Sequence, residues 1–180
     1  MNILGSKITK LIIVRGVLVL LDQVTKAAVR LYLQPYHSIA VIPGFFNLTH
    51  IHNPGGAFGF LAGADPMLRK IVFLFVSFLA VVLILWYYMK TPASYPLLAT
   101  AFAMIFGGAI GNLIDRIRTG KVVDFLDFYL GNLHWPAFNV ADISITIGIG
   151  IFILHLLFNK LPEYIEMLLQ SRRKSLANVN

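Results

Sequence analysis

The pattern of apolar and polar residues divides the chain into four long apolar runs and the polar stretches between them. Each run has about the length that an α-helix needs to cross the roughly 30 Å hydrocarbon core of a membrane. The runs cover about residues 10–32, 70–89, 97–116 and 139–159. The pattern therefore predicts a mostly α, integral membrane protein, with four transmembrane helices in a single membrane domain over residues 1–180.

The composition supports a membrane protein over a soluble one. Charged residues make up 13% of the chain, whereas a soluble domain carries about 25%. Hydrophobic residues make up 58%, and the mean hydropathy is +0.77. The net charge of +7 could indicate a nucleic-acid partner. However, the basic residues gather at the ends of the runs and near the C-terminus, which favours an anionic lipid surface and no nucleic acid.

The first run resembles a cleavable signal peptide, because Lys7 and Lys10 precede an apolar stretch. It leads into Asp22 and Lys26 with only a poor cleavage site, so the sequence predicts a retained first helix. Asp22 and Lys26 are four residues apart and share a helix face. The favoured interpretation is an ion pair that lets the helix enter the membrane, and direct catalysis is the alternative.

Two polar excursions, at residues 33–68 and 117–138, separate the first two and the last two runs. In the first, Leu48, His50 and His52 alternate with other residues, and several glycines and prolines interrupt the stretch. That pattern predicts short strands and turns. The same excursion contains a glycine-rich loop that begins at Asn53, whose backbone could approach a ligand closely.

The third run carries polar residues at helical spacing. Gly108, Asn112 and Arg116 are four residues apart in turn, so they lie on one helix face. Lipid would penalise Asn112 and Arg116, so that face should turn toward protein or trapped water. Gly107 and Gly111 are also four apart and favour close packing against another helix.

The fourth run starts with a helix-capping signal. Asn139 is a plausible N-cap, and Asp142 lies in the first turn after it. Beyond the run, Pro162 opens a predicted amphipathic helix that ends at Arg172–Lys174. Residues 160–180 therefore read as a basic cytoplasmic tail.

Four crossings would place both chain ends on one side of the membrane. Lysines at the ends of the runs and the basic tail favour the cytoplasm for that side, although three basic residues between 116 and 121 weaken this bias. With this topology the loop at Asn53 would meet Arg116, Asp124 and Asp142 at the outer face.

Two carboxylates, Asp124 and Asp142, each lie in a short polar break beside an apolar run. If they meet, repulsion prevents both from ionising, and such a pair can activate water as in aspartyl proteases. The N-terminus of the fourth helix favours the ionised form of Asp142, which makes Asp124 the expected holder of the proton. Their spacing supports equally the alternative that both are helix-terminal caps.

Other classes of site find less support. His50, His52 and His134 could join an aspartate around a metal, but the sequence has no helical metal-binding spacing. We therefore expect no metal and no cofactor, and with no cysteine there is no thiolate ligand or nucleophile. A proton or ion transporter would predict two related halves, which are not seen. A purely structural subunit would not explain three separate acid-bearing breaks.

Four sequence blocks are more specific together than any one of them alone. They are D-Q-V-T-K at 22–26, N-P-G-G-A-F at 53–58, G-G-A-I-G-N-L-I-D-R-I-R-T-G-K-V-V-D-F at 107–125 and F-N-V-A-D-I-S-I at 138–145. In this order they closely resemble the lipoprotein signal peptidases, also called signal peptidase II.

The resemblance implies a bacterial inner-membrane aspartyl endopeptidase. Members remove the signal peptide from diacylglyceryl-modified prolipoproteins just before the lipidated cysteine. On the family's pattern Asp124 and Asp142 are the catalytic pair, with a water activated between them. The positions that would bind substrate or position the pair are Asn53, Gly55, Asn112, Arg116, Asn139, Ala141, Asp22 and Lys26.

The resemblance also implies features around the helices. A small extracytoplasmic β-sheet and a periplasmic helix would come from the two polar excursions. The implied partners are diacylated prolipoproteins and membrane lipids, and the protein would be a monomer. Both termini would be cytoplasmic, with the active site toward the periplasmic face.

Overall fold

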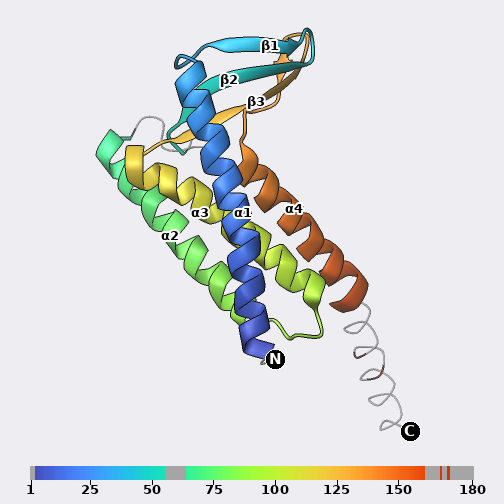
Figure 1. Cartoon of the computed structure of the whole chain (residues 1–180). Helices are drawn as coiled ribbons and strands as arrows, with labels where there is room; N and C mark the ends of the chain where they lie inside the picture. The colour runs from blue at the N-terminus through green and yellow to red at the C-terminus, as the bar shows by residue number, and fades with distance from the viewer. Residues whose placement is uncertain (1–2, 56–63, 161–166, 168–169, 171–180) are drawn as a thin grey trace, which may run out of the picture.

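Four helices form a bundle, and a small sheet lies at one end of it (Figure 1). This computed structural model describes residues 3–55, 64–160, 167 and 170. The helices are α1 (Ile3–Tyr32), α2 (Pro66–Lys90), α3 (Pro96–Thr119) and α4 (Val140–His155), which continues into a π-helical turn, η2 (Leu156–Lys160). The strands are β1 (Ser38–Ile42), β2 (Phe46–Asn53), β3 (Val122–Leu130) and β4 (Leu133–His134).

Each predicted apolar run falls on a helix, and among the described residues three helices are long and apolar enough to cross a membrane. These are Pro66–Lys90, Pro96–Thr119 and Val140–Asn159. The first helix, α1, is long enough, but Arg15, Asp22 and Lys26 interrupt its apolar stretch. The mostly helical membrane fold is thus confirmed, and a fourth crossing by α1 stays a prediction.

The helix ends follow from local sequence. Asp65 caps α2, because its carboxylate accepts hydrogen bonds from the backbone N–H groups of Met67 and Leu68 at 2.9 and 3.0 Å. At the C-terminal end of α3, Gly120 adopts the left-handed conformation with φ 75°, which glycine adopts without steric cost. These two ends fix where the chain enters and leaves the sheet.

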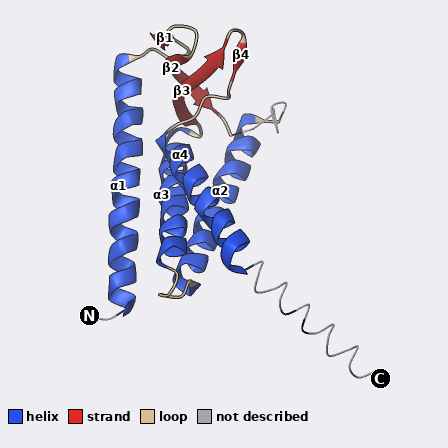
Figure 2. Ribbon diagram, turned by 90° about the vertical axis from the view of Figure 1, so that its right-hand side faces the viewer, coloured by secondary structure: helices blue, strands red, loops and turns tan. Residues whose placement is uncertain are grey.

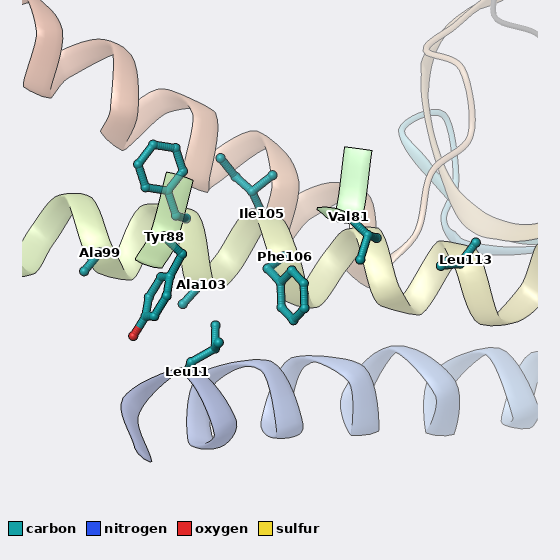
Figure 3. Close-up of a cluster of buried hydrophobic side chains, with 9 residues drawn as sticks. Leu11, Val81, Tyr88, Ala99, Ala103, Ile105, Phe106 and Leu113 are labelled. Atoms are coloured by element: carbon teal, nitrogen blue, oxygen red, sulfur yellow. The ribbon is translucent and has the colours of Figure 1, made fainter. Parts of the chain in front are cut away.

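The hydrophobic core is centred on α3, which packs against α1, α2 and α4. Small and aromatic residues of α3, including Ala103 and Phe106, meet Leu11 of α1 and Tyr88 of α2 (Figure 3). The contact with α4 is especially close, since a Cβ atom added at Gly108 would lie 2.4 Å from the backbone oxygen of Ala141. The packing role predicted for glycines in this helix therefore extends to Gly108.

The four strands form one antiparallel sheet in the order β1-β2-β3-β4 (Figure 2). Strands in residues 33–68 were predicted, and the structure confirms them. In the centre of the sheet Ile51 pairs with Asp124, and Asn53 pairs with Val122. This register brings the start of the glycine-rich loop beside the first predicted catalytic carboxylate.

Two predictions concern residues outside the described part of the chain. The amphipathic helix and basic tail fall almost wholly on residues 161–180, of which only 167 and 170 are described. Between 33 and 65 and between 120 and 138, the described residues form strands, turns and irregular segments. Residues 56–63 of the first excursion are not described, so the periplasmic helix stays a prediction.

Candidate active site

Asn139 lies between the two predicted catalytic aspartates. It is fully buried at the start of α4, where its side chain accepts a hydrogen bond from the backbone N–H of Asp142 at 3.0 Å. In return the Asp142 carboxylate accepts the backbone N–H of Asn139 at 3.2 Å, which completes a capping box. The Asn139 amide nitrogen also donates to Asp124 Oδ1 at 2.7 Å. One residue therefore holds both carboxylates.

Asp124 is held from a second direction by β2. The amide of Asn53 donates to Asp124 Oδ2 at 2.9 Å, and its own oxygen accepts the backbone N–H of Gly55 at 2.8 Å. Gly55 has φ 104°, and a Cβ atom there would lie 2.7 Å from the ring of Phe73. Only glycine suits this turn, which fixes the orientation of the Asn53 amide.

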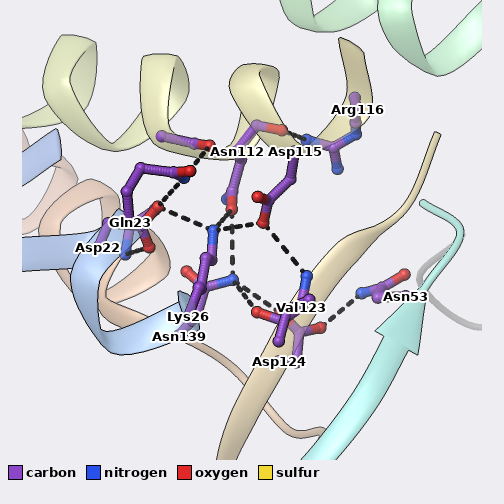
Figure 4. A network of polar contacts seen from close by, with 12 residues as sticks. Asp22, Gln23, Lys26, Asn53, Asn112, Asp115, Arg116, Val123, Asp124 and Asn139 are labelled. Atoms are coloured by element: carbon purple, nitrogen blue, oxygen red, sulfur yellow. Dashed lines mark hydrogen bonds and ion pairs between the residues drawn. The ribbon is translucent and has the colours of Figure 1, made fainter. Parts of the chain in front are cut away.

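Asn112 of α3 links the second aspartate to the helix bundle. Its amide nitrogen donates to Asp142 Oδ1 at 2.8 Å. Its oxygen accepts hydrogen bonds from Lys26 Nζ at 2.9 Å and from the Asn139 amide at 3.2 Å. The polar face predicted for the third helix thus points into the protein, where the Asn112 amide uses both its donor and its acceptor (Figure 4).

The carboxyl group of Asp124 has an unusual electrostatic environment. Its residue is only 2% exposed, and this burial raises the pKa of Asp124 to about 6. The hydrogen bond from Asn53 opposes the rise, and the negative charge of Asp142 adds to it. A carboxyl group with a pKa near 6 can exchange a proton close to neutral pH.

Arg116 faces this pair from α3 with part of its guanidinium unused. Its Nη1 donates to the backbone oxygen of Asn112 at 3.4 Å. Among the described residues, its Nε is the buried side-chain nitrogen left without a hydrogen-bond partner. Buried donors are rarely left unpaired, so the site has the capacity to bind an additional acceptor.

A second polar cluster adjoins the first at Asn112. Lys26 Nζ contacts Asp22 Oδ2 at 2.9 Å and Asp115 Oδ2 at 3.0 Å, which confirms the predicted pairing of Lys26 with Asp22. Asp115 Oδ1 also accepts a hydrogen bond from Arg30 Nη2 at 2.6 Å. Asp22 Oδ1 accepts a hydrogen bond from the backbone N–H of Ala141 at 3.0 Å. We call Asp22, Lys26, Asp115 and Arg30 the closed cluster, since each charge in it has an opposite partner. Figure 4 shows the first three of these residues.

The structure brings all ten sequence-predicted site residues into these two connected networks. Asp115 and Arg30 were missed as members, although Arg30 continues the four-residue spacing of Asp22 and Lys26 on α1. The three histidines considered as metal ligands do not contact the aspartate pair in the hydrogen bonds described. His134 instead pairs with Asp127 at 2.9 Å, farther along β3.

An apolar pocket opens beside Asp142. It encloses about 460 Å³ and extends from the segment before α4 along one face of that helix. Its lining residues are Trp135, Pro136, Ala137, Phe138, Asp142, Ile143, Thr146 and Ile147. A ligand in this pocket would have apolar contacts on most sides and one carboxyl group at its end.

Solved structures share this fold and identify its general class. Two that are described as bacterial membrane enzymes match with TM-scores of 0.74 and 0.71, each at 32% identity. The first covers 88% of this chain and 91% of its own, and the second covers 87% and 95%. In this fold, buried carboxylates join a small sheet to helices that are able to cross a membrane. The fold is therefore that of a membrane enzyme.

The chain belongs to the signal peptidase II family, whose model matches residues 14–158. A protein named lipoprotein signal peptidase from Desulforapulum autotrophicum is 56% identical over 156 residues, covering 87% of this chain and 96% of that protein. One of the same name from Syntrophus aciditrophicus is 49% identical over 138 residues, covering 77% and 86%. The resemblance seen in the four sequence blocks is confirmed, and the chain is a member of a peptidase family.

Proposed function

We propose that this protein is an aspartyl endopeptidase that removes the signal peptide from diacylglyceryl-modified prolipoproteins, cutting just before the lipidated cysteine. Family membership and the name of its relatives support the peptidase activity and the prolipoprotein substrate. The observation that carries the mechanism is the position of Asn139, which hydrogen bonds to both Asp124 and Asp142. Its backbone N–H donates to Asp142 and its side-chain amide donates to Asp124, so one residue keeps the two carboxylates close enough for one to influence the proton of the other.

In this mechanism the pair holds one proton. Asp142, ionised at the N-terminus of α4, accepts a proton from a water molecule as that water attacks the peptide carbonyl. Asp124, whose pKa is raised to about 6 by burial, is the protonated partner that polarises the carbonyl oxygen and then protonates the leaving amine. Asn53 and Asn139 keep the Asp124 carboxyl oriented throughout.

Arg116 would complete the site when substrate binds. A pair with one proton carries one negative charge, which the guanidinium of Arg116 balances. Its unused Nε is available to a carbonyl oxygen of the substrate, so the peptide would satisfy a donor that the protein leaves unpaired. The substrate-binding role proposed for Arg116 rests on this donor.

The substrate's lipid would supply much of the binding energy. The pocket beside Asp142 is apolar on most sides and lies on a membrane helix, so an acyl chain could enter it from the bilayer. Each buried methylene contributes about 0.8 kcal/mol. Placing an acyl chain there would bring the peptide bond next to the modified cysteine close to Asp142.

A fourth crossing by α1 fits the contacts of its charged residues. Asp22 and Lys26 are 1% and 0% exposed and pair at 2.9 Å, so neither charge would face lipid. The guanidinium of Arg15 lies 5.9 Å from the centre of the Phe106 ring. With α1 as a fourth crossing, both termini are cytoplasmic in an inner membrane, and the sheet and site face the periplasm in a monomeric enzyme.

The proposal is tested by cleavage of a lipidated precursor by the purified protein in detergent. We expect the lipidated precursor to be cut and its unlipidated form to be cut far more slowly. We also expect a chelator to leave activity intact, because the mechanism uses only carboxylates. Equal cleavage of both precursors would contradict the lipid account. Loss of activity to a chelator, with recovery on adding zinc, would contradict the aspartyl mechanism.

A further inference from the structure

Two histidines that the proposed reaction does not use lie side by side on β2. His50 and His52 are two residues apart on one strand, so their side chains leave the same face of the sheet. Their Nε2 atoms are 3.2 Å apart, with ring centres 4.8 Å apart and ring planes at 84°. The two Nε2 atoms are therefore within hydrogen-bond distance of each other.

The hydrogen bonds of His50 fix its tautomer. Its Nδ1 lies 2.7 Å from the backbone oxygen of Leu33, and a carbonyl oxygen can only accept a hydrogen bond. The proton of the neutral ring must then be on Nδ1, which leaves the lone pair on Nε2 facing His52. His50 is only 3% exposed, so this orientation is held by its surroundings. Histidines that bind metals commonly donate their second nitrogen to a backbone carbonyl in this way.

We propose that His50 and His52 form a binding site for a divalent transition-metal ion. A tetrahedral ion with metal–nitrogen distances of about 2.05 Å holds two imidazole nitrogens about 3.3 Å apart. The separation of 3.2 Å between the two Nε2 atoms matches that value without movement of the strand. His52 needs only to carry its proton on Nδ1 instead of Nε2, and this change of tautomer alters no charge.

The surroundings determine which ions would bind and how tightly. Burial lowers the pKa of His52, and the positive charges of Lys121 and Arg30 lower it further, so its ring is neutral near pH 7. The same cations repel a metal ion, whereas the charge of Asp115 attracts it. No group of three or more histidine or acidic side chains that could hold a metal occurs in the described residues, so water would complete the coordination.

Imidazole ligands and these charges together predict a site of moderate affinity. Among first-row divalent ions, Cu²⁺ binds such nitrogen sites most tightly, ahead of Zn²⁺ and Ni²⁺. The ring of Tyr36 lies edge-on to His52 with 6.1 Å between the ring centres, and His52 is itself partly exposed. The inference does not depend on the proposed peptidase mechanism, because it uses none of the residues assigned to catalysis.

The test is a titration of the purified full-length protein in detergent with Cu²⁺ at neutral pH, followed by electron paramagnetic resonance. We expect one equivalent bound with two nitrogen ligands. His52→Gln should weaken that binding at least about tenfold and remove the two-nitrogen signature. His52 is the better position to change, since it is partly exposed and its loss leaves the His50–Leu33 hydrogen bond in place.

His134→Gln is the matched control, because His134 is on the same sheet but pairs with Asp127. It should leave Cu²⁺ binding unchanged. The proposal is overturned if the unaltered protein binds no Cu²⁺ with two nitrogen ligands. It is also overturned if His52→Gln binds Cu²⁺ as tightly as the unaltered protein does. In either case the two histidines form only a hydrogen-bonded pair.

Discussion

Two polar clusters meet at Asn112, and they differ in how completely their charges are paired. In the closed cluster two carboxylates and two cations contact one another within 3.0 Å, and Asp115 and Lys26 are fully buried. In the other cluster two carboxyl groups, Asp124 and Asp142, lie close together, and Arg116 retains an unused buried donor. We call this second group the open cluster.

The difference separates what holds the fold from what is available for chemistry. Buried ions are tolerated when each has a partner, so the closed cluster can join α1, α3 and β3 without any ligand. The open cluster keeps a raised pKa and an unpaired donor, which are common in sites that act on a substrate. Neighbouring buried charges can thus serve different purposes. How completely they are paired indicates whether they hold the fold or are available for chemistry.

The largest effect is expected from removing either carboxylate of the open cluster. Asp124→Asn or Asp142→Asn preserves volume but ends acid–base exchange, so turnover should fall by about 10²–10⁴-fold. The protein should still insert into the membrane and still bind lipidated precursor. Asp65→Asn is the matched control, since Asp65 is an exposed carboxylate that caps α2. Near-normal cleavage by either catalytic variant, measured on lipidated precursor, would falsify the mechanism.

Removing the central cation of the closed cluster should mainly affect stability. Lys26→Met leaves Asp22 and part of Asp115 buried without their cation, which should cost about 3–5 kcal/mol. The measurement is thermal unfolding in detergent. Lys90→Met is the control, because Lys90 is exposed at the end of α2. If Lys26→Met unfolded at the same temperature as the control, the closed cluster would not be holding the fold.

The raised pKa of Asp124 predicts that stability depends on pH. Its carboxyl has a pKa of about 6 when folded against an ordinary value of 3.8, so the folded protein binds this proton more tightly. The contribution to stability is therefore complete below about pH 4 and is lost as pH rises toward 6. The loss amounts to about 3 kcal/mol at most.

Asp124→Asn should remove this slope and unfold at a higher temperature than the unaltered protein above pH 6. Asp65→Asn should keep the slope. Unfolding temperatures of the three proteins across this pH range provide the measurement. A slope that persists unchanged in Asp124→Asn would assign the pH dependence to another group.

The smallest effect concerns the packing that brings the two clusters together. A Cβ atom at Gly111 would lie 2.6 Å from Asp22 Oδ2, so Gly111→Ala should cost about 1–3 kcal/mol through overpacking. In contrast, a Cβ atom at Gly150 of α4 would have no neighbour within 4 Å. Gly150→Ala is the matched control and should change stability little. Equal unfolding temperatures for the two variants would show that α1 and α3 can separate at no cost.

The sequence predicted the helices well because lipid imposes a simple requirement on them. A long apolar run can satisfy its backbone only as a helix, so the runs and the helices nearly coincide. The strand β3 was harder to predict, because Asp124 and Asp127 interrupt its apolar residues and its partners are about 75 residues away. The alternation of residues predicted strands only in the first excursion. The sheet itself was expected from the resemblance to a known family.

For the site, residue types and their spacings could be recognised in the sequence, but their partners could not. Asp22 and Lys26 could be paired from their four-residue spacing on one helix, and their contact is confirmed. Asp115 could not be assigned to the same cluster, because that contact depends on how α3 packs against α1. The bridging position of Asn139 also required coordinates, whereas its role as an N-cap did not.

The shared position of Asn112 has a consequence for inhibitors of this protein. Its amide contacts Lys26 of the closed cluster and Asp142 of the open one, so a change there would disturb both. A compound that binds the polar centre would therefore leave the organism few viable escape mutations. A compound that depends on the apolar pocket would not have this protection, because Trp135, Ile143 and Ile147 line it with apolar side chains that other apolar side chains could replace. Resistance should arise first in that pocket.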